Sequence, residues 1–294
     1  MILRARDREL RLGGGTPALM GIVNATPDSF SDGGELPDVA ARVARARELV
    51  AAGAAIVDVG GETASGLEPA VAAEEEAARI VPVIERVAAE LDVVVSVDTH
   101  KPSVAEAAVA AGAHLVNDVS GLRDPAMAAL CARTGAALVI THTRARPKEK
   151  VFPHYEDVVA DVVEFLQERE RVARSHGVAG ESIVLDPGID LAKTPAESVE
   201  LLRRLDRLAA LGRPLLVAVS RKDFIGVLTE RPPAARDAGT LAAVGAALRR
   251  GARILRVHDV AAARDYLRVH AALEGERAME AGASLEGELM REHA

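Results

Sequence analysis

Residues 19 to 34 read LMGIVNATPDSFSDGG, and this stretch organises our interpretation of the whole chain. Its first five residues, Leu19 to Val23, are apolar or small and have the pattern of a buried strand. Asn24 then begins a polar run that is rich in turn-forming residues and about a dozen residues long, whereas connections usually have about two to six residues. Such a strand and loop are typical of a functional edge, although a surface loop without function fits this stretch equally well.

From this stretch to about residue 273, the chain repeats one unit. Each unit consists of a short apolar strand, a polar turn and an Ala-rich helix. We expect strands near residues 18–23, 55–59, 93–97, 114–117, 136–140, 182–185, 214–219 and 253–256. Helices are expected near residues 38–52, 70–90, 102–111, 124–133, 155–176, 195–210, 237–250 and 260–273, with a kink or restart at Pro82. This alternation predicts parallel strands and, with eight units, an α/β fold of the (β/α)8 TIM-barrel class.

The two ends of the chain differ from this repeat. Residues 1–16 alternate aliphatic and charged side chains and close with three glycines, which predicts a β-hairpin that caps the barrel. The barrel itself is expected to span residues 17–273 as a single domain. Residues 274–294 are acidic and only weakly apolar, so we expect a tail that is helical or disordered.

The composition excludes several classes of protein. The chain of 294 residues has 49% hydrophobic residues, 27% charged residues and a net charge of -8, which argues against a general nucleic-acid or acidic-membrane surface. Its one cysteine, Cys131, excludes an internal disulfide and fits a reducing compartment. No apolar run approaches the roughly 18 residues of a membrane span, and the first residues do not resemble a signal peptide. We therefore expect a cytoplasmic protein.

Polar residues end every predicted strand. In a barrel of this class the chemistry lies at the carboxyl ends of the strands. In chain order these residues are Asn24; Asp58 and Glu62; Asp98, Thr99 and His100; Asn117 and Asp118; Thr141 and His142; Asp186; Ser220, Arg221 and Lys222; and Arg256, His258 and Asp259. A single Asp after a strand is most often a helix N-cap, but eight coincident endings favour a binding site.

The residue types at this edge predict a site for a polar heterocycle that carries phosphate. Burying Asp98, Asn117 and Asp186 together would cost several kcal/mol unless a ligand forms hydrogen bonds with them. A heterocycle with amine and amide edges would do so. A cationic rim on the opposite side would suit phosphates, and it consists of Arg221, Lys222, Arg256 and His258.

A metal site is the alternative interpretation of the same edge. Asp98, His100, His142, Asp186 and His258 are legitimate ligand types for a metal-dependent hydrolase. Against this alternative, no His-x-His pair closes the first strand, and the cationic rim would repel a tightly held cation.

Seven motifs resemble those of dihydropteroate synthase, an enzyme of folate biosynthesis. They occur in the order and at the spacing of that family between about residues 18 and 272, and they read MGIVNATPDSFSDGG, IVDVGGE, SVDTHKP, HLVNDVSG, VLDPG, VAVSRK and ILRVHDV. The resemblance implies a transferase that condenses 6-hydroxymethyl-7,8-dihydropterin pyrophosphate with p-aminobenzoate and releases pyrophosphate.

The resemblance also implies roles for individual residues. The pterin would be held by Asp98, Asn117, Asp186 and Lys222. Asn24, Arg256 and His258 would bind the pyrophosphate, and Asn24 would contact the Mg2+ that accompanies it. The aminobenzoate side would include Phe30, Thr63, Ser220 and Arg221, and the chain would form a homodimer.

Three segments depart from the family pattern. After GGE the family reads STRPG, whereas this chain has Thr63, Ala64, Ser65, Gly66 and Leu67. DPGFGFGK becomes DPGIDLAK, and MHMxG becomes THTRA. These changes fall mainly on the aminobenzoate side, so we expect weak inhibition by sulfonamides. They leave open a paralogue that joins the pterin to another amine or performs no condensation, and a methyltetrahydrofolate-binding barrel of another class. If the chain is a working synthase, Arg144, Arg146 or Lys148 would replace the arginine that the family has in the segment after GGE.

Overall fold

The computed structural model describes residues 1–13, 17–25, 39–62 and 70–278. Within these residues, eight parallel strands form a closed barrel in the order β10-β3-β4-β5-β6-β7-β8-β9. The strands are β3 (Ala18–Asn24), β4 (Ile56–Gly60), β5 (Val94–Asp98), β6 (Leu115–Asp118), β7 (Ala137–Thr141), β8 (Ile183–Asp186), β9 (Leu215–Val217) and β10 (Ala252–Val257). The predicted TIM barrel is confirmed, and the strand positions agree with the apolar runs to within one or two residues.

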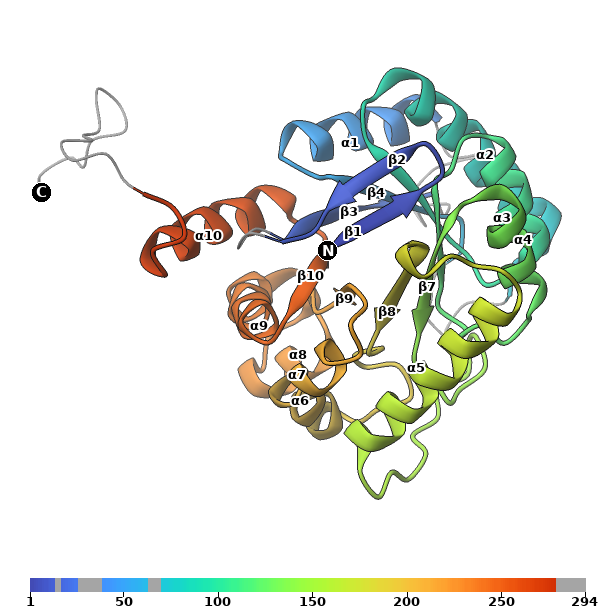
Figure 1. Cartoon of the computed structure of the whole chain (residues 1–294). Helices are drawn as coiled ribbons and strands as arrows, with labels where there is room; N and C mark the ends of the chain where they lie inside the picture. The colour runs from blue at the N-terminus through green and yellow to red at the C-terminus, as the bar shows by residue number, and fades with distance from the viewer. Residues whose placement is uncertain (14–16, 26–38, 63–69, 279–294) are drawn as a thin grey trace, which may run out of the picture.

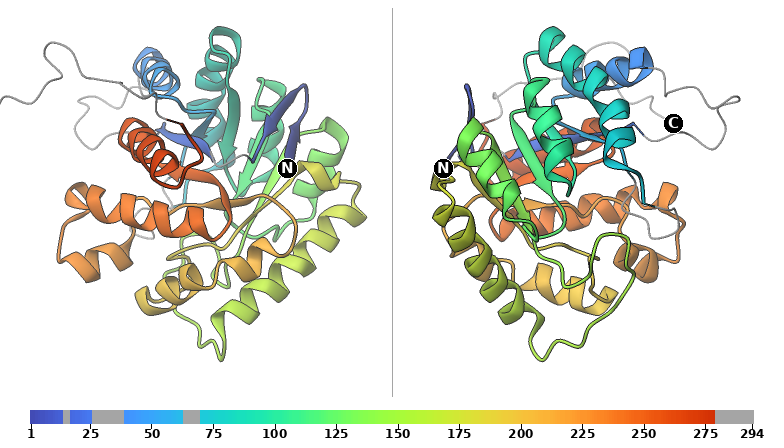
Figure 2. Two further views of the ribbon diagram at one scale, coloured as in Figure 1. Left: turned by 60° about the vertical axis from the view of Figure 1, so that its left-hand side comes forward. Right: turned by 90° about the vertical axis from the view of Figure 1, so that its right-hand side faces the viewer.

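Helices surround the barrel, and neighbours in sequence pack side by side (Figures 1 and 2). They are α1 (Val39–Ala51), α2 (Ala73–Glu90), α3 (Pro102–Ala110), α4 (Ala126–Thr134), α5 (Val158–Ser175), α6 (Pro195–Arg203), α7 (Asp206–Ala209), α8 (Asp223–Thr229), α9 (Asp237–Arg249) and α10 (Val260–Leu273), with short 3-10 turns at Gly180–Ser182 and Pro233–Ala235. None of the helices in the described ranges has the length and apolar character needed to cross a membrane.

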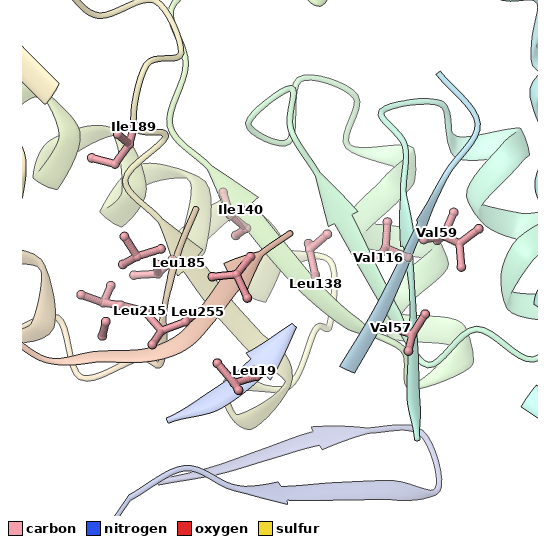
Figure 3. Packing of buried hydrophobic residues seen from close by; sticks show 14 of the residues in the cluster. Leu19, Val57, Val59, Val116, Leu138, Ile140, Leu185, Ile189, Leu215 and Leu255 are labelled. Atoms are coloured by element: carbon pink, nitrogen blue, oxygen red, sulfur yellow. The ribbon is translucent and has the colours of Figure 1, made fainter. Parts of the chain in front are cut away.

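The main hydrophobic core lies between the barrel and this ring of helices. Alternate strand residues such as Val57, Val116 and Leu138 are buried there, and Figure 3 shows their side chains together with those of neighbouring strands. Aliphatic residues dominate this layer because parallel strands are covered on their outer face by helices. The core can therefore be built mainly from aliphatic side chains, which agrees with the low aromatic content of the sequence.

The N-terminal hairpin packs against the interior of the barrel. Strands β1 (Ile2–Ala5) and β2 (Arg8–Arg11) pair in antiparallel register, with Leu3 opposite Leu10. Leu3 and Leu12 are buried against the interior residues Met20 and Ile254 in a second hydrophobic cluster. The predicted N-terminal β-hairpin is thus present (Figure 1), and its buried face packs against residues of the barrel interior.

Three local features differ from the sequence interpretation. The predicted helix 195–210 divides into α6 and α7 because Arg204 leaves the helical region, with φ -117°. Helix α8, which has 7 residues, was not predicted because it is too short to show a periodic pattern. Helix α2 neither ends nor restarts at Pro82, since residues on both sides of the proline, including Ile80 and Val87, bury the same face.

Candidate active site

A buried network centred on Asp58 occupies the C-terminal mouth of the barrel. Asp58 on β4 is fully buried and accepts hydrogen bonds from Ser96 Oγ at 2.5 Å, Asn117 Nδ2 at 3.1 Å and Arg256 Nε at 2.7 Å. These donors come from β5, β6 and β10. Strand register explains the arrangement in part, since Asp58 lies opposite Ser96 in the β4–β5 pairing. We call Asp58, Ser96, Asn117, Arg256 and Asp98 the Asp58 network.

Arg256 joins two carboxylates in this network. Its Nη2 donates to Asp98 Oδ2 at 2.8 Å, while its Nε donates to Asp58. The sequence interpretation placed the acids and the bases on opposite sides of the mouth. For Arg256 the structure differs, because the long guanidinium side chain of β10 reaches across to the ends of β4 and β5. Hydrogen bonds from a guanidinium to two carboxylates are short and directional, so they fix the orientation of all three side chains.

Asn117 has an acceptor with no partner. Its Oδ1 atom is buried and makes no hydrogen bond within the described residues, whereas its amide nitrogen is fixed on Asp58. A buried carbonyl oxygen without a partner costs about 1–3 kcal/mol. A ligand N–H group placed over Asn117 would remove this cost.

Two further carboxylates have raised pKa values because they are buried. Burial raises the pKa of Asp98 to about 7 against the opposing charge of Arg256. Burial also raises the pKa of Asp186, although the backbone N–H of Gly188 donates to its Oδ1 at 2.8 Å and Lys222 lies near. Near neutral pH, Asp98 can therefore either accept or donate a hydrogen bond, which suits the mixed donor and acceptor edge of a heterocycle.

Ser220 and His258 form a second, smaller group. The side-chain oxygen of Ser220 lies 2.9 Å from His258 Nδ1 and accepts the backbone N–H of His258 at 3.2 Å. Burial, with Arg221 and Arg256 nearby, lowers the pKa of His258 to about 4. The imidazole is therefore neutral at pH 7, and its Nε2 can donate a hydrogen bond if Ser220 donates to Nδ1.

The next two residues of the SRK motif face different neighbours. Arg221 has φ 60°, and its Nε donates to Asp237 on α9 at 3.0 Å. Lys222 precedes α8, and burial lowers its pKa while Asp190 and Asp186 raise it. Of the predicted cations, Arg221 is thus paired with an acid on α9, and Lys222 is half-buried within the electrostatic influence of Asp190 and Asp186.

Asn24 is the remaining predicted site residue that the described part of the chain contains. Asn24 ends β3 opposite Gly60 of β4 and is exposed, so its amide oxygen is available to a ligand. Phe30 and Thr63 lie outside the described residues. Glu62 directly precedes Thr63; it accepts from Lys101 Nζ at 2.8 Å and lies 3.4 Å from Lys148 Nζ.

The metal ligands of the alternative interpretation are not gathered into one cluster. His142 Nε2 lies 2.8 Å from Asp161, and its Nδ1 lies 2.8 Å from Lys193 Nζ, so the ring faces α5 and the loop after β8. Within the described residues, no group of three or more His, Cys, Asp and Glu could hold a metal ion. One exposed amide, Asn24, does fit a Mg2+ that is bound mainly by substrate phosphates.

Sequence reasoning omitted two residues from the predicted site. Asp58 was noted as a strand ending, and its position between Val57 and Val59 in a buried strand was the available signal. Lys193 is the lysine that ends the DPGIDLAK segment, and the sequence assigns it no role. It is among the largest fully buried side chains, and no local pattern indicates the carbonyl groups that it contacts.

Comparison with known proteins gives a consistent result. A family model described as pterin binding enzyme matches residues 20–258. Dihydropteroate synthase of Bacillus subtilis is 42% identical over 243 residues, which cover 82% of this chain and 83% of that protein. Dihydropteroate synthase of Xanthomonas albilineans, solved with 4-aminobenzoic acid, is 44% identical with a TM-score of 0.86, covering 93% of this chain and 99% of that one. The same enzyme in complex with 7,8-dihydropteroate is 45% identical with a TM-score of 0.82, covering 92% of this chain and 98% of the other.

These matches and the polar barrel mouth agree with the motif resemblance. The chain belongs to the dihydropteroate synthase family of pterin-binding enzymes.

Proposed function

We propose that the chain is a dihydropteroate synthase, which condenses 6-hydroxymethyl-7,8-dihydropterin pyrophosphate with p-aminobenzoate to give 7,8-dihydropteroate and pyrophosphate. The observation that carries this proposal is the unpartnered, buried Oδ1 of Asn117 inside the Asp58 network. Asp98, Asn117, Asp186 and Lys222 would hold the pterin through its amine and amide groups. The raised pKa values of Asp98 and Asp186 support pairing with a neutral heterocycle.

The leaving group would be bound on the β3 and β10 side of the mouth. Arg256 supplies a fixed positive charge, and neutral His258 can supply a hydrogen bond from Nε2. Asn24 would contact a Mg2+ carried by the pyrophosphate, which would neutralise the charge that develops on the departing oxygen. Preorganised donors at the site of charge development stabilise the transition state.

The acceptor, p-aminobenzoate, would approach from the β9 side, where Ser220 and Arg221 lie. Phe30 and Thr63 are proposed as further contacts. The lone pair of the acceptor amine attacks the exocyclic methylene carbon, so a carbon–nitrogen bond forms as the carbon–oxygen bond to pyrophosphate breaks. The amine then releases one proton to solvent. An aromatic amine is neutral at pH 7, so no general base needs to be assigned.

A second candidate is a pterin-binding paralogue that uses a different amine or performs no condensation. The segment DPGIDLAK after β8 favours this candidate, because Ile189, Asp190 and Leu191 give it a different shape and charge from the family pattern. The measurement that separates the candidates is release of pyrophosphate with p-aminobenzoate and with a panel of other amines. We expect release only when the pterin substrate, p-aminobenzoate and Mg2+ are all present.

Other outcomes of this assay have clear meanings. Turnover with another amine but not with p-aminobenzoate would support the paralogue. Tight pterin binding without turnover on any amine would contradict the synthase. Sulfonamides would inhibit weakly under the first candidate, because the acceptor side is altered.

We also infer a cytoplasmic homodimer. The buried single thiol of Cys131 supports a reducing compartment. Exposed apolar side chains on α8 and α10, Val227, Leu228, Val269 and Leu273, support a contact with a second copy. Light scattering after size exclusion should give the mass of a dimer, and Leu228→Lys with Leu273→Lys should shift it to that of a monomer.

A further inference from the structure

The loop after β8 holds an unusual backbone conformation. Between Asp186 and α6, two residues other than glycine have positive φ, namely Asp190 at 63° and Ala192 at 50°, and Gly188 has φ 65°. The left-handed region costs an L-residue about 1–2 kcal/mol, although Asp tolerates it better than most. Tertiary contacts must therefore stabilise this loop.

Lys193 supplies many of these contacts. Its Nζ lies 2.9 Å from Gly188 O, 2.9 Å from Leu191 O and 3.3 Å from His142 O, and the residue is fully buried. Tyr155 adds a hydrogen bond from its hydroxyl to Ala192 O at 2.9 Å. The loop is thus a rigid element of the site.

This rigid loop directs Asp190 toward the chain segment that follows β9. The backbone N–H of Asp190 donates to Ser198 Oγ at 3.1 Å, which fixes the residue from α6. Its Oδ2 accepts the backbone N–H of Asp223, the residue directly after Lys222. Its Oδ1 is buried and has no hydrogen-bond partner within the described residues. A carboxylate is therefore fixed next to the segment that carries Lys222, with one oxygen free.

The charges around Lys222 come from several elements. Asp190 from the loop, Asp186 from β8 and Asp223 on α8 all favour its protonated form, in that order, while burial and Arg256 from β10 disfavour it. Burial is the main cause that lowers the pKa values of Lys193 and His258, and the charge of Lys222 lowers them further. Asp190 is the acid with the largest effect on Lys222, and it is the one whose position depends on the strained loop.

We propose that Asp190 is a positioning residue that fixes the Lys222 segment through the N–H of Asp223 and holds a negative charge beside the Lys222 ammonium. This inference rests on the proposed function to the extent that Lys222 binds the pterin. In this proposal, the left-handed backbone conformation of the loop places Asp190 next to the segment that carries Lys222. The pterin contact then depends on a residue that need not touch the substrate.

The first test measures Lys222 itself and needs no substrate. Asp190→Asn removes the charge but keeps a side-chain oxygen for the N–H of Asp223. The rate of acetylation of Lys222 by acetic anhydride, followed by peptide mass spectrometry across pH, reports its titration midpoint because only the neutral amine reacts. We expect the midpoint to fall by about one pH unit in Asp190→Asn, since an opposite charge within about 4–6 Å shifts a pKa by about 1–3 units. The matched control, Asp206→Asn on the exposed start of α7, should not move it.

The second test measures pterin binding. In Asp190→Asn the alkaline limb of the pH profile for binding of the pterin pyrophosphate should move to lower pH by the same amount as the Lys222 midpoint. Asp190→Gly should also move it, although that variant relieves the backbone strain. An unchanged Lys222 midpoint in both variants, with only a lower melting temperature, would overturn the proposal and leave Asp190 with a structural role.

Failure of the proposed function would appear differently. If the unaltered protein neither binds the pterin pyrophosphate nor releases pyrophosphate, the synthase assignment fails. A shifted Lys222 midpoint in Asp190→Asn would still support the pairing of Asp190 with Lys222.

Discussion

The two sides of the barrel mouth are built in different ways. On the side of β4 to β6, the strands themselves place Asp58, Asp98 and Asn117, and hydrogen bonds between these residues and Arg256 hold the group together. On the side of β8 and β9, a loop in a strained conformation and one buried side-chain amine, that of Lys193, determine the geometry. The first side is therefore encoded by strand register, and the second by tertiary contacts.

The largest effect is expected for Asp58→Ala. This change removes three hydrogen bonds and leaves Arg256 without its buried partner. Loss of one partner of a buried ion pair costs about 3–5 kcal/mol. We expect this loss in the free energy of unfolding by urea denaturation, together with loss of pterin binding. An effect below about 1 kcal/mol would show that Asp58 does not organise this side of the mouth.

The loop side should respond most strongly to Gly188→Ala. A Cβ atom at Gly188 would lie 2.0 Å from His142 O, and φ is 65°. Backbone strain and overpacking together should cost about 3 kcal/mol. Gly212→Ala is the matched control, because φ there is 77° but nothing lies within 4 Å of the added atom. It should cost only about 1 kcal/mol by thermal denaturation, and equal costs would refute the contact argument.

A smaller, local effect is expected for Lys193→Met. The substitution keeps the volume but removes the donor to Gly188 O and Leu191 O, so stability should fall by about 2 kcal/mol. Hydrogen exchange of the Leu191 amide, which donates to Gly188 O, should accelerate well beyond the change in β6 (Leu115–Asp118). Uniform acceleration across both regions would mean that the loop is not an independent structural unit.

A separate effect concerns pH. The pKa of Asp98 is raised to about 7 in the folded protein from 3.8, so the folded state retains a proton that the unfolded state loses. The stability that this proton provides is complete below about pH 4 and is lost as pH rises toward 7. The free energy of unfolding of the protein minus that of Asp98→Asn should therefore decrease over this range. A difference that increases with pH would mean that Arg256 outweighs burial.

The periodicity of the sequence predicted the structural features that depend on strand register. The eight strands, the hairpin and the polar edge follow from alternating apolar runs and from the residues that end them. The contact of Arg256 with Asp58 and Asp98 could not be predicted from periodicity. A long side chain can reach several strands, and its partner depends on the tertiary structure. Asp190 and Lys193 are similar cases, since left-handed φ values at residues other than glycine have no local signal. Helix α8 was too short for its pattern to be seen.

Recognition of the pterin at the barrel mouth should depend on the network of Asp58 and Asn117. Calorimetric titration of Asn117→Leu with the pterin pyrophosphate, in the absence of p-aminobenzoate, tests it most directly, with circular dichroism to show that the variant is folded. The substitution removes the free Oδ1 and the hydrogen bond to Asp58 while nearly conserving volume. We predict that the dissociation constant rises about 100-fold, which corresponds to about 2.8 kcal/mol. An unchanged dissociation constant in a folded variant would contradict the account.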